Sequence, residues 1–338
     1  VESFTTTGKK TESNRMKVLR KVLFAILWFS LLLPSLLFAQ MDWENPTIIE
    51  RNRLPAHATF IPYQSVSKAL IDDREQSKNF KLLNGDWKFK WSFRPEEAPS
   101  NFHDPIYEVN EWDEIRVPAP WQTQGYGTAL YSNFDWAFNY NPPRAYSSML
   151  GNETGSYRRK FTVPSDWDGR RVIIHFDGVK SAFHIWLNGE QIGYSQGGST
   201  PTEFDLTSHL QKGENVLAVR VYRWSDGSYL ENCDHWRMSG IFRDVYLFST
   251  PQVHLRDFEL TGDLTNNYQD GILKTTAWVK NYDNASVKDY NVELSLYDEQ
   301  QRQIFGPEKK RVPVLSPGEE KQITFRREVS NPDKWSAE

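Results

Sequence analysis

The chain has 338 residues, with 40 Lys and Arg against 44 Asp and Glu, so its formal net charge is −4. A charge this close to balance gives no electrostatic argument for a nucleic-acid binder. The single cysteine, Cys233, excludes an internal disulfide framework and a cysteine-based zinc finger. Aromatic residues make up 14% of the chain, and flat rings suit both dense β-cores and sugar-facing clefts.

The first 39 residues are typical of a leader rather than of a folded domain. Residues 1–15 are polar and without period, which indicates read-through from upstream, and Met16 is the expected start. Residues 16–39 combine a basic beginning with a long apolar run, which predicts a secretory signal peptide cleaved after Ala39. We therefore expect a periplasmic or secreted protein. The alternative is a membrane anchor of about the minimum spanning length.

Residues 40–78 follow as an extended segment, in which prolines at positions 46, 55 and 62 interrupt any regular pattern. Strand patterns begin with residues 80–93, which alternate around an Asn84-Gly85 turn signal. Further strands are expected at residues 157–163, 171–176, 182–187 and 215–222, with hairpin-type turns at Asn188-Gly189 and Lys212-Gly213. No window of the sequence has a sustained repeat of apolar residues with the helical period of about 3.6 residues. Residues 79–251 are therefore predicted to form an antiparallel jelly-roll sandwich.

A second unit is expected over residues 252–338. Its strand patterns cover residues 253–264, 271–279, 290–297 and 321–326, with the spacing of immunoglobulin-like strands. Such a sandwich needs about seven strands, and this segment offers about five. The fold class is therefore all-β: a jelly roll followed by an incomplete, truncated immunoglobulin-like sandwich.

Several common enzyme motifs are absent from the sequence. It has no glycine-rich phosphate loop, no serine elbow and no His-Glu-x-x-His. The seven histidines are dispersed without metal-binding spacing, and His175 and His184 fall inside strand patterns. Ordinary packing is therefore the expected role of these two side chains.

Residues 222–244 form a long polar and aromatic stretch between two strands, and such loops are usually functional. Its carboxylates are Asp226, Glu231 and Asp234, and its rings are those of Trp224, Tyr229 and Trp236. Oxygen ligands beside aromatic rings could hold a hard cation and a sugar together. The alternative is a buried turn network in which Arg237 and Arg243 pair with these acids. Composition alone leaves both interpretations open.

Residues 118–143 form a second long stretch, rich in amides and aromatic rings. Asn133 and Asn139 could offer paired donors and acceptors to sugar hydroxyls. Composition alone favours the alternative, a surface loop held down by its aromatic side chains.

These stretches resemble the long β-galactosidases of glycoside hydrolase family 2. The resemblance extends over residues 42–338, and its most specific part is Trp236-Arg-Met-Ser-Gly-Ile-Phe-Arg-Asp244. Further matching segments are residues 42–46, 52–57, 83–87, 176–183, 201–206, 224–231 and 331–338.

The resemblance implies site residues position by position. Asp234 matches an aspartate that contacts galactose hydroxyls and a sodium ion (Na⁺), and Asn133 matches an asparagine of the same sugar site. The positions that match residues around a structural magnesium ion (Mg²⁺) are Asp42, Asn45, Gln196 and Asp226. Cys233 and His235 depart from the family pattern beside Asp234.

The resemblance also implies that the catalytic residues are absent from this chain. A retaining glycosidase needs two carboxyl groups about 5–5.5 Å apart. In the family both are glutamates of a (β/α)₈ barrel downstream, a pattern that this sequence lacks. Glu231 and Asp234 are an alternative pair that the family's use of this loop disfavours.

The sequence is therefore expected to be the N-terminal part of a β-galactosidase that acts with retention, inactive alone. Rival interpretations are a free-standing carbohydrate-binding protein and a family 2 enzyme for a glucuronide or mannoside. A homo-oligomer is expected, with residues 45–60 between subunits, and neither a nucleic-acid partner nor a stable membrane anchor is expected.

Overall fold

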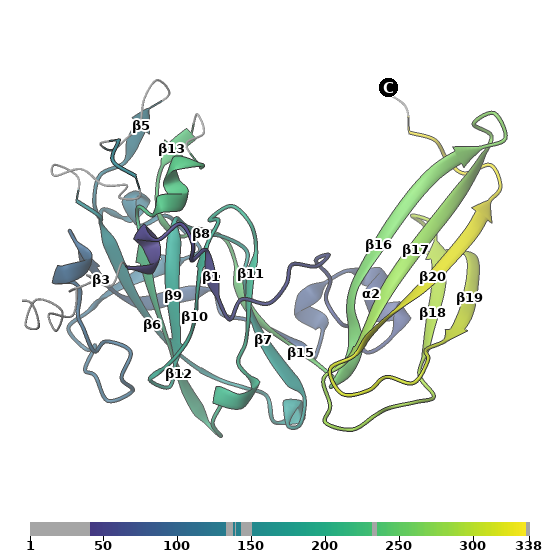
Figure 1. The fold of residues 1–338 in the computed structure, drawn as a ribbon, viewed down its shortest axis with the longest axis horizontal. Helices are drawn as coiled ribbons and strands as arrows, with labels where there is room; N and C mark the ends of the chain where they lie inside the picture. The colour runs from purple at the N-terminus through teal and green to yellow at the C-terminus, as the bar shows by residue number, and fades with distance from the viewer. Residues whose placement is uncertain (1–40, 133–137, 139, 143–150, 232–234, 336–338) are drawn as a thin grey trace, which may run out of the picture.

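The computed structural model describes residues 41–335, apart from 133–137, 139, 143–150 and 232–234. Two β-sandwiches lie side by side, and the short helix α2 (Val66–Ile71) lies between them (Figure 1). No helix in the described part of the chain is long and apolar enough to cross a membrane. The expected leader, residues 16–39, and the stretch 1–15 lie outside the described residues.

The first sandwich packs a seven-stranded antiparallel sheet against a four-stranded one. The larger sheet has the order β1-β10-β9-β12-β6-β3-β4 and the smaller one β11-β7-β15-β2. The larger sheet comprises β1 (Glu50–Arg51), β3 (Gly85–Ser92), β4 (Asp113–Val117), β6 (Thr154–Thr162), β9 (Ala182–Leu187), β10 (Glu190–Gln196) and β12 (Glu214–Tyr222). The smaller comprises β2 (Phe80–Leu82), β7 (Arg171–Phe176), β11 (Thr202–Asp205) and β15 (Val245–Thr250).

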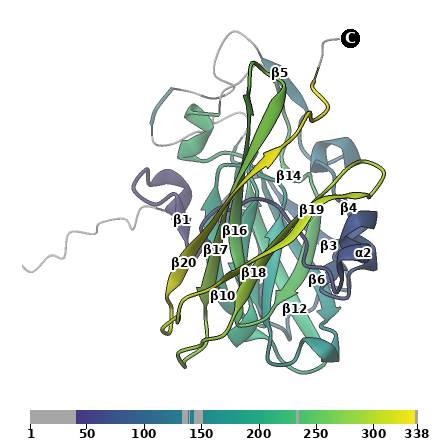
Figure 2. The same ribbon diagram turned by 90° about the vertical axis from the view of Figure 1, so that its right-hand side faces the viewer.

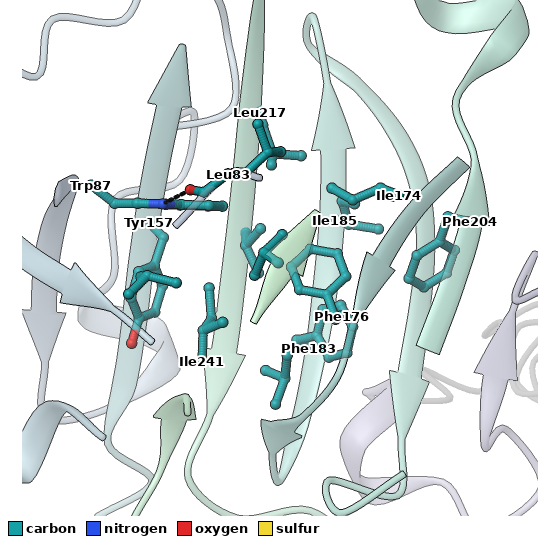
Figure 3. Close-up of a cluster of buried hydrophobic side chains, with 14 of the residues drawn as sticks. Leu83, Trp87, Tyr157, Ile174, Phe176, Phe183, Ile185, Phe204, Leu217 and Ile241 are labelled. Atoms are coloured by element: carbon teal, nitrogen blue, oxygen red, sulfur yellow. Dashed lines mark hydrogen bonds between the residues drawn. The ribbon is translucent and has the colours of Figure 1, made fainter. Parts of the chain in front are cut away.

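The core between these sheets explains much of the aromatic content. Phe89, Phe176 and Phe204 are fully buried there, and Trp87 donates a hydrogen bond from Nε1 to the Leu83 carbonyl at 2.9 Å (Figure 3). Full burial of one such side chain stabilises the fold by about 1.5–3 kcal/mol. The rings of this core hold the two sheets together.

The outer face of the smaller sheet is also covered at β7, which is why this strand is buried along its whole length. Ile173 of β7 packs outward with Phe80 and Tyr246, against Leu54 and Ile61 of the N-terminal segment. That segment contains η1 (Asp42–Glu44), β1, α2 and η2 (Arg74–Gln76). Residues 41–78 therefore lie along the jelly roll of their own chain.

The second sandwich has five strands in its described part. A three-stranded sheet joins β16 (Val253–Thr265), β17 (Asp270–Asn281) and β20 (Glu320–Val329). A two-stranded sheet joins β18 (Asn291–Tyr297) and β19 (Gln303–Arg311), as Figure 2 shows from the side. Val279, Ile323 and Phe325 are core residues of this sandwich. The predicted all-β fold class, a jelly roll followed by an immunoglobulin-like sandwich, is confirmed.

One of the two predicted hairpin turns leads between strands that do not pair. Asn188-Gly189 joins β9 to β10 as a hairpin, with positive φ at both residues. Asn84-Gly85 instead joins β2 to β3, and Lys212-Gly213 leads into β12 after β11; the strands joined belong to different sheets. A turn signal marks a change of chain direction, but it does not show whether the next strand pairs or crosses over.

The remaining short elements lie in the connections. They are η3 (Pro95–Glu97), η4 (Trp121–Gln124), β5 (Leu130–Ser132), η5 (Ser165–Trp167), β8 (Val179–Lys180), η6 (Thr207–His209), η7 (Asp226–Tyr229), β13 (His235–Arg237) and β14 (Gly240–Ile241). Two of them, β5 and β13, stand above one end of the jelly roll in Figure 1.

Candidate functional site

The two long stretches singled out in the sequence meet in a small antiparallel ribbon. Strand β5 comes from the first stretch and β13 from the second, and Tyr131 is the register partner of Trp236. Their ring centroids are 5.4 Å apart at an interplanar angle of 52°. Both side chains are about half exposed, at 49% and 51%. The ribbon therefore presents two neighbouring aromatic rings to solvent.

Asn133 and Asp234 adjoin this ribbon in the chain. Asn133 directly follows Ser132, the last residue of β5, and Asp234 directly precedes His235, the first residue of β13. Both lie outside the described residues, as do Cys233 and Asn139. The roles of Asn133 and Asp234 in sugar binding stay predictions.

The base of the ribbon is a layer of buried aromatic and amide side chains. Asn152 donates to the Trp224 carbonyl at 3.0 Å and accepts from the Trp224 N–H at 2.9 Å, so its amide fixes that backbone. Phe138 packs edge-on against both Trp224 and Tyr229, with centroids 5.1 and 4.9 Å away. The backbone at Trp224 and the rings of Trp224 and Tyr229 are therefore held by side chains from neighbouring parts of the chain.

A small cavity lies beneath the ribbon. It is about 10 Å³ in volume, and Lys180, Ser181 and Glu231 are among its lining residues. This volume is about that of one water molecule. A sugar ring is far larger and would not fit into this cavity.

Glu231 is one of the three carboxylates of the second stretch. Its Oε1 accepts the Gly198 N–H at 2.9 Å. Burial raises the pKa of Glu231, against the opposing effects of Lys180 and the Gly198 N–H. Asp226 Oδ1 accepts from the Gln196 amide, and Arg243 donates to the Ser199 carbonyl. The described partners of these two acids are thus amide groups.

The four predicted magnesium ligands separate into two groups. Both oxygens of Asp42 accept from Arg51, at 2.7 and 2.8 Å, and Oδ2 also lies 3.1 Å from His184 Nε2. The hydrogen bonds of Arg51 hold the pKa of the Asp42 carboxyl well below its usual range. Asn45 Oδ1 accepts from Thr47 N and Oγ1, at 3.1 and 2.7 Å. Asp42 and Asn45 thus have other partners.

Gln196 and Asp226 are brought together beside these two residues. The Gln196 amide nitrogen lies 2.6 Å from Asp226 Oδ1, 2.8 Å from the Tyr194 hydroxyl and 3.5 Å from the Ile48 carbonyl. Burial raises the pKa of Asp226, and the nearby Glu44 adds to this rise.

This arrangement fits a hard cation in part. Rotation of the Gln196 amide would turn its oxygen toward the Asp226 carboxylate and the Ile48 carbonyl, and all three are ligands of the kind that Mg²⁺ takes. Asp42 would first have to release Arg51. Among the described residues, no group of three or more His, Cys, Asp and Glu side chains is arranged to hold a metal.

Two charged networks were not foreseen from the sequence. Glu153 and Arg223 form an ion pair at 2.7 Å under the ribbon. Elsewhere, Glu203 lies between two histidines: Oε2 is 2.8 Å from His57 Nε2 and Oε1 is 2.7 Å from His175 Nδ1. No local motif reveals such pairs, because their members are distant in the sequence.

A family model agrees with this arrangement: residues 80–251 match the sugar binding domain of glycosyl hydrolases family 2. A β-galactosidase of Priestia megaterium is 44% identical over 303 residues, which cover 88% of this chain. One of Vibrio vulnificus is 39% identical and covers 90% of the chain. In both comparisons the chain spans 29% of the relative's length.

Solved structures share the fold. A β-glucuronidase from glycoside hydrolase family 2 superposes with a TM-score of 0.61 at 23% identity, over 76% of this chain and 27% of its own. Bacteroides uniformis β-glucuronidase 2 gives a TM-score of 0.60, also at 23% identity, over 76% of this chain and 28% of its own.

Proposed function

The chain belongs to glycosyl hydrolase family 2, and on this premise we propose that it is the N-terminal, sugar-contacting part of a β-galactosidase. The observation that carries the proposal is the β5–β13 ribbon. Two stretches with the residues expected for galactose contact meet there and expose the rings of Tyr131 and Trp236. The identity to proteins named β-galactosidase, at 37–44%, supports galactose as the sugar.

In the proposed site, the ribbon forms one wall of a galactose pocket. Asn133 and Asp234 would bind sugar hydroxyls, and Asp234 would also bind a sodium ion. The half-exposed rings suit a pyranose, whose C–H face packs on an aromatic surface while its hydroxyls need polar partners.

The chemistry itself is proposed to come from a part of the protein other than this chain. Retaining hydrolysis needs an acid/base and a nucleophile about 5–5.5 Å apart. The roles proposed for this chain are binding and positioning. We therefore expect no turnover by the chain alone.

The test compares four reactions. The full-length protein should hydrolyse p-nitrophenyl β-galactoside far faster than the matching β-glucuronide, and the 338-residue chain should hydrolyse neither. A preference for the glucuronide would assign the other sugar. Turnover by the chain alone would refute the proposed division of roles, and binding without any activity of the full-length protein would leave a carbohydrate-binding protein.

Export and assembly complete the proposal. Residues 16–39 are proposed to direct secretion to the periplasm or beyond. N-terminal sequencing of the mature protein should then give Gln40 as its first residue.

Residues 45–60 are proposed to support a homo-oligomer. Their deletion should reduce the molar mass measured by light scattering, and an unchanged mass would refute that role.

A further inference from the structure

A buried ion pair lies beneath the β5–β13 ribbon. Arg223 Nη1 is 2.7 Å from Glu153 Oε1, and the two side chains are 0% and 3% exposed. Two charges this deeply buried are costly to take out of water, and they are tolerated only where geometry and further hydrogen bonds compensate. The structure supplies such bonds on both sides of the pair.

Glu153 holds the first of the two stretches. Its Oε1 accepts the Thr128 N–H, and its Oε2 accepts Trp121 Nε1–H, both at 3.3 Å. A Cβ atom on Gly127 would lie 2.0 Å from Glu153 Oε2, and Gly127 has a φ of +64°. The carboxylate is therefore pressed against the backbone just before β5 begins.

Arg223 holds the second stretch. Its Nη2 donates to the carbonyl of Arg237, the last residue of β13, at 3.1 Å. The pair is also rooted in the sheet, because the Arg223 N–H donates to the Glu153 carbonyl at 2.9 Å beside the β6–β12 ladder. One ion pair thus connects the central sheet to the last residue of β13 and to the backbone two residues before β5.

We propose that Glu153 and Arg223 are positioning residues that set the position and orientation of the sugar-contacting ribbon relative to the jelly-roll sheet. A two-stranded ribbon is marginal by itself, so its orientation depends on what lies beneath it. Apolar side chains could fill the same space, but they would not fix the Thr128 N–H and the Arg237 carbonyl at defined points. The proposal rests on the function proposed above.

The test uses Glu153→Gln in the full-length protein, with Asp205→Asn as the matched control. Asp205 accepts from Arg171, whose side chain is 5% exposed, so each variant removes the charge that faces a buried arginine. Glu153→Gln should raise KM for p-nitrophenyl β-galactoside by about tenfold or more, with kcat changed far less. Asp205→Asn should leave KM unchanged. Gly127→Ala should also raise KM, because it displaces the carboxylate and keeps both charges.

Hydrogen exchange on the same proteins separates this proposal from the function it rests on. Glu153→Gln should speed exchange of the β5 and β13 amides and leave β8 and β14 as they are. If Glu153→Gln and Asp205→Asn lower Tm alike without a change in KM or in β5 exchange, the positioning role is wrong. If the wild-type protein has no galactosidase activity, the proposed function fails, and the exchange pattern still decides whether the pair orders the ribbon.

Discussion

Ser132 of β5 lies directly opposite His235 of β13, so the two strands pair at the very point where each stretch leaves the described residues. The pairing joins parts of the chain that are far apart in the sequence. In the chain, Asn133 directly follows Ser132 and Asp234 directly precedes His235. The described ends of the two stretches therefore meet at this pair, which supports the proposal of a sugar site shared by both loops.

The exposed ring of Trp236 should matter more for binding than for folding. In the full-length protein, Trp236→Ala should raise KM for a β-galactoside by about three- to tenfold, since a ring contact contributes about 0.5–1.5 kcal/mol. The free energy of unfolding should fall by less than about 1 kcal/mol, because the side chain is half exposed and loses mainly its pairing with Tyr131. Steady-state kinetics and urea denaturation measure the two effects. An unchanged KM would remove Trp236 from the site.

Trp87 should have the opposite profile. Its side chain is 1% exposed in the jelly-roll core, so Trp87→Ala should lower the free energy of unfolding by about 3–5 kcal/mol. The control is Trp335→Ala: this side chain is 90% exposed, and its loss should change stability by less than about 0.5 kcal/mol. Urea unfolding of the 338-residue chain measures both. Equal effects at the two positions would contradict the described core.

The presence of a strand was predictable from the sequence because it depends on the local pattern of residues. Alternation and β-branched residues mark β7, β9 and β12 whatever they pair with. The partner of a strand depends on the whole fold, so β5 and β13 were recognisable as loops with functional composition, but their pairing was not. Strand β19 (Gln303–Arg311) escaped notice because Gly306-Pro307 interrupts its pattern.

The candidate site divides in the same way. Asp226 and Gln196 carry a family pattern and were named from the sequence. Glu153 and Arg223 carry no pattern, because an ion pair between distant residues leaves no spacing to recognise. His175 and His184 lie within strands, in agreement with the ordinary packing role expected from the sequence. Their carboxylate partners, Glu203 and Asp42, became apparent only in the structure.

Magnesium ions should stabilise the chain through Asp226. We propose that Mg²⁺ binds Gln196 and Asp226, with Asn45 and Asp42 completing the site once Asp42 releases Arg51. The raised pKa of Asp226, which results from burial and from Glu44, shows a carboxylate that a cation would favour in its charged form. Added Mg²⁺ should raise Tm, because its binding increases the free energy of unfolding, by about 2.7 kcal/mol at a free concentration of 100 times Kd.

The matched control for magnesium is again Asp205→Asn: Asp205 lies on β11 of the smaller sheet, whereas Gln196 lies on β10 of the larger one. EDTA should reverse the Mg²⁺-induced rise in Tm in the wild type and in Asp205→Asn. Asp226→Asn should have no such rise to reverse, because a neutral amide is a weaker ligand for Mg²⁺. An equal rise in Asp226→Asn would place the ion elsewhere.

The Glu203 network should make stability depend on pH in a defined window. Burial opposes charge on His57 and His175, but hydrogen bonds to Glu203 (and, for His175, also to Asp177) outweigh it and raise both pKa values above 6.5. Their contribution is complete below pH 6.5 and is lost as pH rises through the folded pKa values.

Burial also opposes charge on Glu203, yet the two histidines lower its pKa below 4.5. Its contribution is present above pH 4.5 and is lost as pH falls through the folded pKa. The network should therefore stabilise most between about pH 4.5 and 6.5.

Glu203→Gln isolates this network from other histidines that act in the opposite sense. Burial lowers the pKa of His184, and it lowers that of His254 to about 4, so these two favour the folded state as pH rises. The difference in unfolding free energy between wild type and Glu203→Gln cancels their effect. By urea denaturation, that difference should be largest near about pH 5.5 and should shrink toward about pH 8.

The control is Asp205→Asn, because the partners of Asp205 are Arg171 and Thr207. The difference in unfolding free energy between wild type and Asp205→Asn should stay constant over this pH range. Equal differences for Glu203→Gln at both pH values would mean that the histidines do not change charge between them, and that Glu203 stabilises the fold through hydrogen bonds alone.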